Sequence, residues 1–198
     1  FGVGGAFRPG GITGVRLELT VPPSSALEQA TPVWVQWEVP NADGDVVEYG
    51  RPLTLTKGVP SRTWLYAPLM PDVDSSNVWS VRVFEYQDGL RGAEIGGARI
   101  RPSDANAQLI PPTMSMLGVV GQRAMGLTQY SSRLPTGQMN RPSSAHEDTR
   151  VISGIQPTQL PDRWDALRGY EAIAWSDASP QDLPPEIGRA SCRERVYC

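Results

Sequence analysis

The chain has 198 residues, of which 39% are hydrophobic and 20% charged, so its composition is that of a globular protein rather than a disordered one. Glycine (20 residues) and proline (19 residues) are frequent, which favours many turns and disfavours an all-helical bundle. The net charge of −3 argues against nucleic acid as a partner, and one histidine with two cysteines exclude a His/Cys-rich metal site. No apolar run reaches the roughly 18 residues of a membrane-spanning helix.

The two ends of the chain differ from the rest. It begins at Phe1 rather than at methionine, so either an N-terminal segment has been removed or the reading frame is open upstream. Residues 186–196 resemble the translation of a common sequencing adapter, and we interpret 186–198 as read-through outside the fold; the alternative is a genuine basic tail. Without these residues the chain keeps 15 basic and 19 acidic residues and no cysteine, which excludes a thiol nucleophile in residues 1–185.

The first hundred residues alternate apolar and polar side chains with a period of two, which is typical of strands that are buried on one face. Turn residues separate the segments, among them Asp43-Gly44 and Asp88-Gly89. The predicted strands lie at about residues 15–21, 33–39, 46–49, 52–56, 62–69, 78–86 and 93–101.

Strands of this number and spacing predict a β-sandwich of immunoglobulin-like or fibronectin-like type over residues 1–102. Since residues 1–102 contain no cysteine, the sandwich is not a disulfide-linked immunoglobulin domain. Its interior is expected to contain the residues of the apolar faces, which are Val15, Leu17, Leu19, Val33, Val35, Trp37, Trp79, Val81 and Val83.

Two tryptophans, Trp34 and Trp64, lie off the apolar faces and are the candidate ligand-facing aromatics. An exposed indole can stack on a sugar or anchor a partner. The alternative is that both pack at a sheet edge or at the junction between domains.

The pattern changes after a polar, proline-containing linker at residues 103–113. Three short apolar segments, 116–120, 151–155 and 172–175, are predicted to be neighbouring parallel strands of a Rossmann-like α/β domain. Short helices are expected after Gly121, within 160–167 and from Ser179 onwards. Residues 114–185 would then form the N-terminal part of an incomplete domain, whose sheet continues with strands encoded after residue 185.

No residue is identified as catalytic, cofactor-binding or metal-binding, and no cofactor is expected. The spacing of Gly118 and Gly121 lacks the third glycine of a dinucleotide fingerprint and the Gly-Lys-Ser/Thr of a P-loop. His146 stands beside Glu147 in a polar segment, and we interpret it as a surface histidine in a loop rather than as part of a charge relay.

Several segments together resemble a known family. They are Gly-Ala-Phe-Arg-Pro-Gly at residues 5–10, Trp-Leu-Tyr-Ala-Pro-Leu at 64–69, Trp-Ser-Val-Arg-Val-Phe-Glu at 79–85, Leu-Pro-Asp-Arg-Trp at 160–164 and Tyr-Glu-Ala-Ile-Ala-Trp-Ser-Asp at 170–177. The pattern is similar to large bacterial envelope proteins that carry an N-terminal β-sandwich, then a class I glutamine amidotransferase-like α/β domain, and end in a transmembrane helix. The resemblance covers nearly all of residues 5–185.

The resemblance implies a membrane-anchored protein on the extracytoplasmic side of a bacterial membrane, with the anchor in segments missing here. It does not imply glutaminase chemistry, because the nucleophilic cysteine of true class I amidotransferases has no counterpart in residues 1–185. The first functional hypothesis is a non-catalytic binding or scaffold portion whose partner is a protein or an envelope component. The alternatives are a fragment of an amidotransferase-like or hydrolase-like enzyme with its catalytic residues beyond the truncation, and a carbohydrate-binding sandwich.

Overall fold

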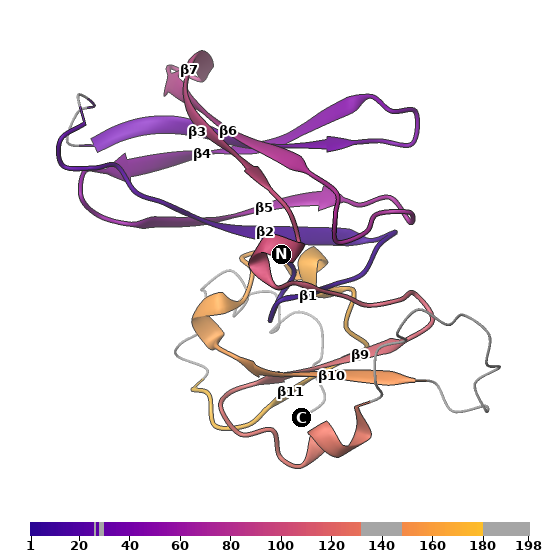
Figure 1. The fold of residues 1–198 in the computed structure, drawn as a ribbon. Helices are drawn as coiled ribbons and strands as arrows, with labels where there is room; N and C mark the ends of the chain where they lie inside the picture. Colours follow the sequence, from indigo (N-terminus) through magenta and orange to yellow (C-terminus); the bar gives the residue numbers. More distant parts are fainter. Residues whose placement is uncertain (26, 28–29, 132–147, 180–198) are drawn as a thin grey trace.

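The computed structural model describes the chain except residues 26, 28–29, 132–147 and 180–198. Strands make up 52% of the structure, and the helical turns of the described residues are short 3-10 turns. The fold is therefore β-rich, with the elements arranged in a stack of two parts (Figure 1).

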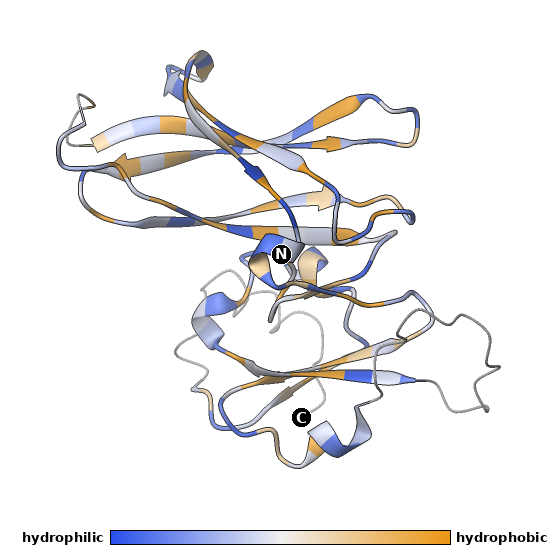
Figure 2. Ribbon diagram, in the orientation of Figure 1, coloured by the Kyte–Doolittle hydropathy of each residue, from blue (hydrophilic) through white to orange (hydrophobic). Residues whose placement is uncertain are grey.

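Residues 12–100 form two antiparallel sheets. The wider sheet has the order β4-β3-β6-β7, with β3 at Ala30–Pro40, β4 at Val46–Thr56, β6 at Trp79–Gln87 and β7 at Leu90–Ile100. The narrower sheet pairs β2 (Ile12–Leu19) with β5 (Ser61–Pro68). The two sheets lie over one another as a sandwich, and Figure 2 shows apolar and polar residues alternating along their strands.

The predicted interior of the sandwich is confirmed for seven of its nine residues. The predicted residues buried in the hydrophobic cluster between the sheets are Val15, Val33, Val35, Trp37, Trp79, Val81 and Val83. Leu17 and Leu19 are only partly buried and pack against this cluster, because β2 lies at the edge of the narrower sheet.

The two predicted hairpin turns are also present. Gly44 has φ +83° in the turn between β3 and β4, and Asp88 and Gly89 both have positive φ between β6 and β7, as a type I′ turn requires. The prediction of two separate segments at 46–49 and 52–56 is wrong, because β4 runs through Gly50 and Pro52 as one strand. β4 is an edge strand, where a proline costs no hydrogen bond to a neighbour.

The second part contains a parallel sheet of order β10-β9-β11. Its strands are β9 (Ser115–Val120), β10 (Thr149–Ile155) and β11 (Ala172–Trp175). The prediction that these three segments are neighbouring parallel strands is confirmed by their register, in which β9 pairs with both others. β9 is central and largely buried, which explains its continuous apolar run.

The short helices expected in this part are 3-10 turns within the described residues, so an α/β character is not established. They are η2 at Leu127–Tyr130, η3 at Pro157–Gln159 and η4 at Trp164–Leu167. Pro157 and Gly169 bracket a segment too short for a stable α-helix. The helix expected after Ser179 and the adapter-like residues 186–198 lie outside the described residues.

The segment 103–113, predicted as a linker, is built into the fold. It contains η1 (Ser103–Ala105) and β8 (Gln108–Leu109), and β8 pairs in parallel with β1 (Ala6–Phe7). Ile110 is fully buried in a second hydrophobic cluster, because that cluster joins the two parts of the molecule. The division into domains at these boundaries stays a prediction.

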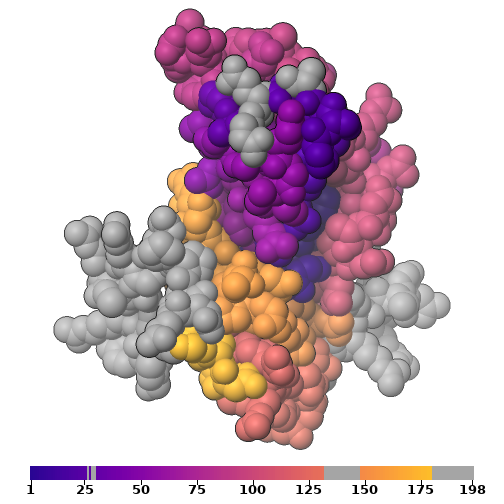
Figure 3. Space-filling model, turned by 90° about the vertical axis from the view of Figure 1, so that its left-hand side faces the viewer, coloured from indigo at the N-terminus to yellow at the C-terminus, as the bar shows by residue number. Residues whose placement is uncertain are grey.

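This second cluster takes residues from both parts of the chain. Figure 3 shows residues of the sandwich lying directly on residues of the C-terminal part. Its buried members are Val3, Ala6, Trp64, Ile110, Met114, Met116, Val120, Ile152, Ile155, Leu160 and Leu167.

Candidate functional site

The two candidate ligand-facing tryptophans have different surroundings. Trp64 is only 8% exposed, belongs to the cluster between the two parts, and stacks on Tyr66 with ring centroids 6.3 Å apart. Trp64 is therefore not presented to solvent. Its position is the one described by the alternative, in which the tryptophan packs at the junction between domains. Trp34 is partly exposed on the outer face of the wider sheet, 5.5 Å from the ring of Tyr86. The indole lies over Gly50, where a Cβ atom would collide with it.

Two sets of polar contacts between the described residues lie at the junction between the two parts. On one side of it, Asp162 joins two strands of the sandwich. Its carboxylate accepts a hydrogen bond from the hydroxyl of Tyr66 and forms an ion pair with Arg51 at 2.5 Å. The backbone N–H of Asp162 donates to the same Tyr66 hydroxyl at 3.1 Å. We call these three residues the junction triad.

The junction triad shifts the ionisation of its own members. Burial, with the neighbouring Asp162 carboxylate, raises the pKa of Tyr66 well above its ordinary value. Burial alone would raise the pKa of Asp162, but the hydrogen bonds from Tyr66 and Arg51 outweigh it and lower that pKa. Tyr66 is thus a neutral donor and Asp162 an anion, which is an arrangement for holding two surfaces together.

A second set of polar contacts fixes the start of the parallel sheet to the N-terminal segment. Arg8 donates to the carbonyl oxygen of Met114 and pairs with Glu171 at 3.3 Å. The other carboxylate oxygen of Glu171 accepts the backbone N–H of Met116 at 2.5 Å. The buried hydroxyl of Tyr170 donates to the carbonyl oxygen of Val3 at 2.6 Å, and burial raises its pKa.

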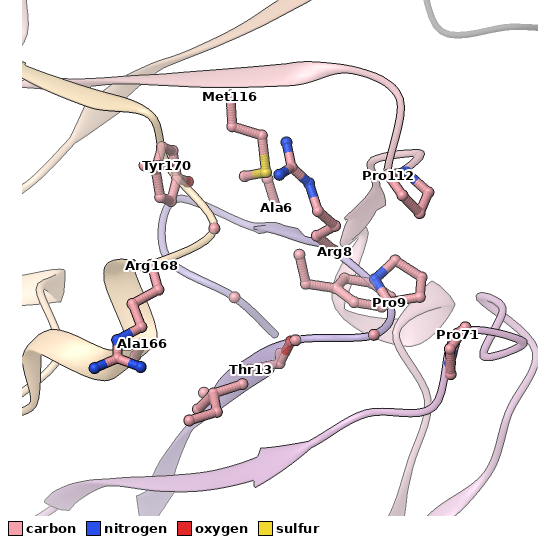
Figure 4. Close-up of a pocket in the computed structure, with 17 residues that line it drawn as sticks. Ala6, Arg8, Pro9, Thr13, Pro71, Pro112, Met116, Ala166, Arg168 and Tyr170 are labelled. Atoms are coloured by element: carbon pink, nitrogen blue, oxygen red, sulfur yellow. The ribbon is translucent and has the colours of Figure 1, made fainter.

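A cavity of about 620 Å³ lies beside these contacts (Figure 4). Its walls come from the glycine-rich segment 9–14, from Met116 on β9 and from the segment that leads into β11, with Tyr170. Figure 4 shows Arg8 reaching along one wall toward Met116. The Nε atom of Arg8 is buried without a hydrogen-bond partner, so the guanidinium has a donor left for a further group.

A further group of polar contacts lies at the carboxyl ends of β9 and β11. Asp177 follows β11, and its Oδ1 accepts backbone N–H groups of Gln122 at 2.7 Å and Arg123 at 3.4 Å, just beyond β9. The hydrogen bond from the Ser176 hydroxyl, and then those backbone donors, lower the pKa of Asp177. In open parallel sheets, ligands bind outside the carboxyl ends of the strands where the strand order reverses. In the order β10-β9-β11, that position is between β9 and β11.

Within the part of the chain that the structure describes, no three His, Cys, Asp or Glu side chains are placed to hold a metal ion. His146, Cys192 and Cys198 lie outside the described residues. Among the described helices, none is long and apolar enough to cross a membrane.

No family model matches this chain, and a search of curated proteins finds no similar sequence.

Sequence reasoning did not single out the polar residues of the junction. Arg8 and Asp162 stand in the segments that carry the family resemblance, but nothing local marks them as contact residues. Asp162 bonds to Tyr66, which is 96 positions away, and to Arg51, which is 111 positions away. No short-range pattern carries that information.

Proposed function

We propose that this chain is the non-catalytic binding or scaffold portion of a bacterial envelope protein, held at the extracytoplasmic side of the membrane by segments outside this sequence. The cellular setting rests on the resemblance of residues 5–185 to such proteins. The partner is a protein or another envelope component.

The observation that carries the scaffold proposal is the junction. A shared hydrophobic cluster, the junction triad and the Arg8–Glu171 pair link the sandwich to the parallel sheet. Such links hold two parts of a chain in one orientation, which is what a scaffold requires and what a pair of freely jointed domains lacks.

The finer fold assignment belongs to the same proposal. The order β4-β3-β6-β7 facing β2-β5 is consistent with the C′-C-F-G and B-E strands of an immunoglobulin-like sandwich. The order β10-β9-β11 is consistent with the first three strands of an α/β domain of the amidotransferase-like type.

The complete reading frame tests the proposal first. A hydrophobic span, with no Gly-x-Cys-x-Gly elbow and later histidine, supports a membrane-anchored scaffold. In cells, the full-length protein should sediment with membranes and be cut by protease added outside the cytoplasmic membrane. Protection from that protease would contradict the proposed location.

An enzyme fragment is the second candidate, and the convergence of the loops after β9 and β11 favours it. If the complete frame supplies a cysteine elbow and a histidine, the full-length protein should hydrolyse glutamine or an ester, and replacing that cysteine by serine should abolish the activity. If the full-length protein has the cysteine elbow but hydrolyses neither glutamine nor an ester, the binding role is favoured over the enzyme.

A carbohydrate-binding sandwich is the third candidate, favoured by the Trp34–Tyr86 pair on the outer face of the wider sheet. Oligosaccharides should then change tryptophan fluorescence in the wild type but not in Trp34→Ala. The same change in both would place the responding tryptophan elsewhere.

A further inference from the structure

The cavity of about 620 Å³ at the junction has the size of a small-molecule site, for which roughly 300–1,000 Å³ is typical. Its walls include buried residues from both parts of the molecule, such as Gly14 of β2 and Met116 of β9. Exposed residues, among them Ile12 and Arg168, also line it, so the cavity is open to solvent. A small solute can therefore enter it while both parts stay folded.

Most side chains of the lining are apolar, and its charged members are both arginines. Arg8 and Arg168 line the cavity, whereas no described residue of the lining is an aspartate or a glutamate. Apolar contacts are offered by Ile12, Met116 and the ring of Tyr170. A ligand that matches this lining has an apolar body and a negative charge.

Arg8 has hydrogen-bond donors left for such a ligand. Of the five N–H groups of a guanidinium, its contacts use three: Nη2 donates to Met114 and to Glu171, and Nη1 donates once to Glu171. The N–H of Nε and a second N–H of Nη1 remain. Nε is buried, but the side chain as a whole is 22% exposed, so a ligand reaches the guanidinium through Nη1.

The backbone of β2 offers a further donor to the cavity. The carbonyl oxygen of Gly14 accepts the N–H of Gly2 at 2.8 Å, on the edge of β2 that faces away from β5. In an antiparallel strand the N–H and C=O of one residue point to the same edge, so the N–H of Gly14 points there too. Among the described strands β2 pairs with β5 alone, so this N–H has no strand as its partner. Because Gly14 is buried, an acceptor on a ligand would satisfy a donor that is costly to leave unpaired.

The ion pairs around the cavity leave one net positive charge. Arg8 pairs with Glu171. Arg163 and Arg168 share Asp165, so three arginines and two carboxylates give a net charge of +1. Figure 4 shows the guanidinium of Arg168 turned away from Arg8, so Arg8 is the arginine placed to contact a charged group in the cavity. A carboxylate, with one negative charge, matches this arrangement, whereas a phosphate dianion would bring a second charge without a partner.

We propose that this cavity binds a small organic carboxylate with an apolar body. Arg8 binds the carboxylate, and the N–H of Gly14 offers a further donor to the same ligand. The apolar body lies against Met116 and the ring of Tyr170. This inference goes beyond the proposed function, whose partner is a protein or another envelope component, and does not depend on it.

Nuclear magnetic resonance of the 198-residue chain tests the proposal, with hydrocinnamate as the probe. This ion carries one carboxylate on a phenylethyl body. Hydrocinnamamide is the neutral probe of the same shape, and benzylphosphonate is the phosphate-like one. Hydrocinnamate should shift the amide resonance of Gly14 and the ring resonances of Tyr170 in a saturable manner. It should bind at least about tenfold more tightly than hydrocinnamamide, because only the carboxylate forms a charge-assisted hydrogen bond with Arg8.

Two substitutions should change the affinity for hydrocinnamate in opposite directions. Arg8→Gln should weaken it by about tenfold or more, because the cation is lost. Glu171→Gln should strengthen it by about threefold or more, because Arg8 loses a competing anion. The glutamine keeps an oxygen that can accept the N–H of Met116, as Glu171 does. Arg99→Gln is the control, since Arg99 is exposed on β7 and does not line the cavity, and its affinity should equal that of the wild type.

Equal affinity for hydrocinnamate and hydrocinnamamide would overturn the proposal. Tighter binding of benzylphosphonate would do the same, as would the absence of a saturable shift at Gly14 and Tyr170. If Arg8→Gln does not fold, Glu171→Gln decides the outcome, because a loss of stability by itself does not tighten binding. Unchanged or weaker binding of hydrocinnamate by Glu171→Gln would contradict the role given to Arg8.

Discussion

Asp162 connects more of the molecule than any pattern in its sequence suggests. Its carboxylate reaches a tyrosine of β5 and an arginine of β4, and its backbone N–H returns to the same tyrosine. Hydrogen bonds to a charged group contribute more to stability than neutral ones, and partial burial protects them from solvent screening. The effect of single substitutions at the junction triad should therefore be measurable.

Replacing Tyr66 with phenylalanine should lower the free energy of unfolding by about 1–3 kcal/mol, because the Oδ1 atom and the N–H of Asp162 both lose the Tyr66 hydroxyl. Denaturant unfolding measures this change. Tyr130→Phe is the matched control, since Tyr130 is 64% exposed and lies away from the junction, and its stability should equal that of the wild type. Equal stability of Tyr66→Phe and the wild type would show that the junction triad contributes nothing.

The pH dependence of stability should report on Asp162. Its pKa in the folded state lies below the ordinary value of 3.8, so the ionised carboxylate stabilises the fold at pH values above 3.8. That contribution is lost as the pH falls below 3.8 through the folded-state pKa. The gap in unfolding free energy between the wild type and Asp162→Asn should be largest near neutral pH and should shrink in acid.

Asp45→Asn serves as the control for that titration, because Asp45 lies in the exposed turn between β3 and β4. The difference in unfolding free energy between Asp45→Asn and the wild type should not change with pH in step with the titration of Asp162. If the gap for Asp162→Asn stays constant from pH 7 to pH 3, the Asp162 carboxylate is not held by the contacts described here.

At the level of the elements, β9 and its exit loop organise the parallel sheet. The strand pairs on both sides and ends at Val120, and Gly121 follows it with φ +119°. This backbone conformation favours glycine, and the space beside it is filled by the Ser176 hydroxyl and the Asp177 carboxylate. The loops after β9 and β11 are thereby held against each other.

Gly121→Ala should destabilise the protein by about 1–3 kcal/mol, because the new Cβ meets both side chains and the backbone is strained. Thermal unfolding measures this effect. Gly169→Ala is the matched control: nothing lies within 4 Å of its added Cβ, so its stability should change by less than about 0.5 kcal/mol. A neutral Gly121→Ala would mean that the loop can shift away from Asp177 at no cost.

At the level of the whole molecule, the shared hydrophobic cluster makes the sandwich and the parallel sheet depend on each other. Trp64 is a strand residue of the sandwich, yet its side chain packs with Ile110 and Met116 of the other part. A large side chain at such a place contributes to the stability of both parts.

Trp64→Ala should therefore lower the unfolding free energy by about 3–5 kcal/mol, and hydrogen exchange should accelerate in β5 and in β9 alike. Trp34→Ala removes an indole that is partly exposed on the outer face, so its cost should be smaller, about 1–2 kcal/mol. Faster exchange confined to β5 in Trp64→Ala would show that the two parts are stable independently of each other.

The local patterns of the sequence were sufficient for the strands and for the faces they bury. Alternation placed Val33, Val35 and Trp37 inside, and a continuous apolar run marked β9 as a strand covered on both sides. These features follow from the two-residue period of a strand and from the removal of apolar surface from water, so a short window of sequence contains them.

Only the tertiary structure decided which strands became neighbours and what lay between the two parts. The same period of two gives Trp34 and Trp64 outward positions, yet one is partly exposed and the other is buried, because a second part of the chain covers β5 near Trp64 and does not cover Trp34. The junction triad likewise depends on this covering of the sandwich, because it joins Asp162 to Tyr66 and Arg51, which lie 96 and 111 positions away. Contacts of that kind depend on how whole elements pack, and neither residue type nor local spacing specifies them.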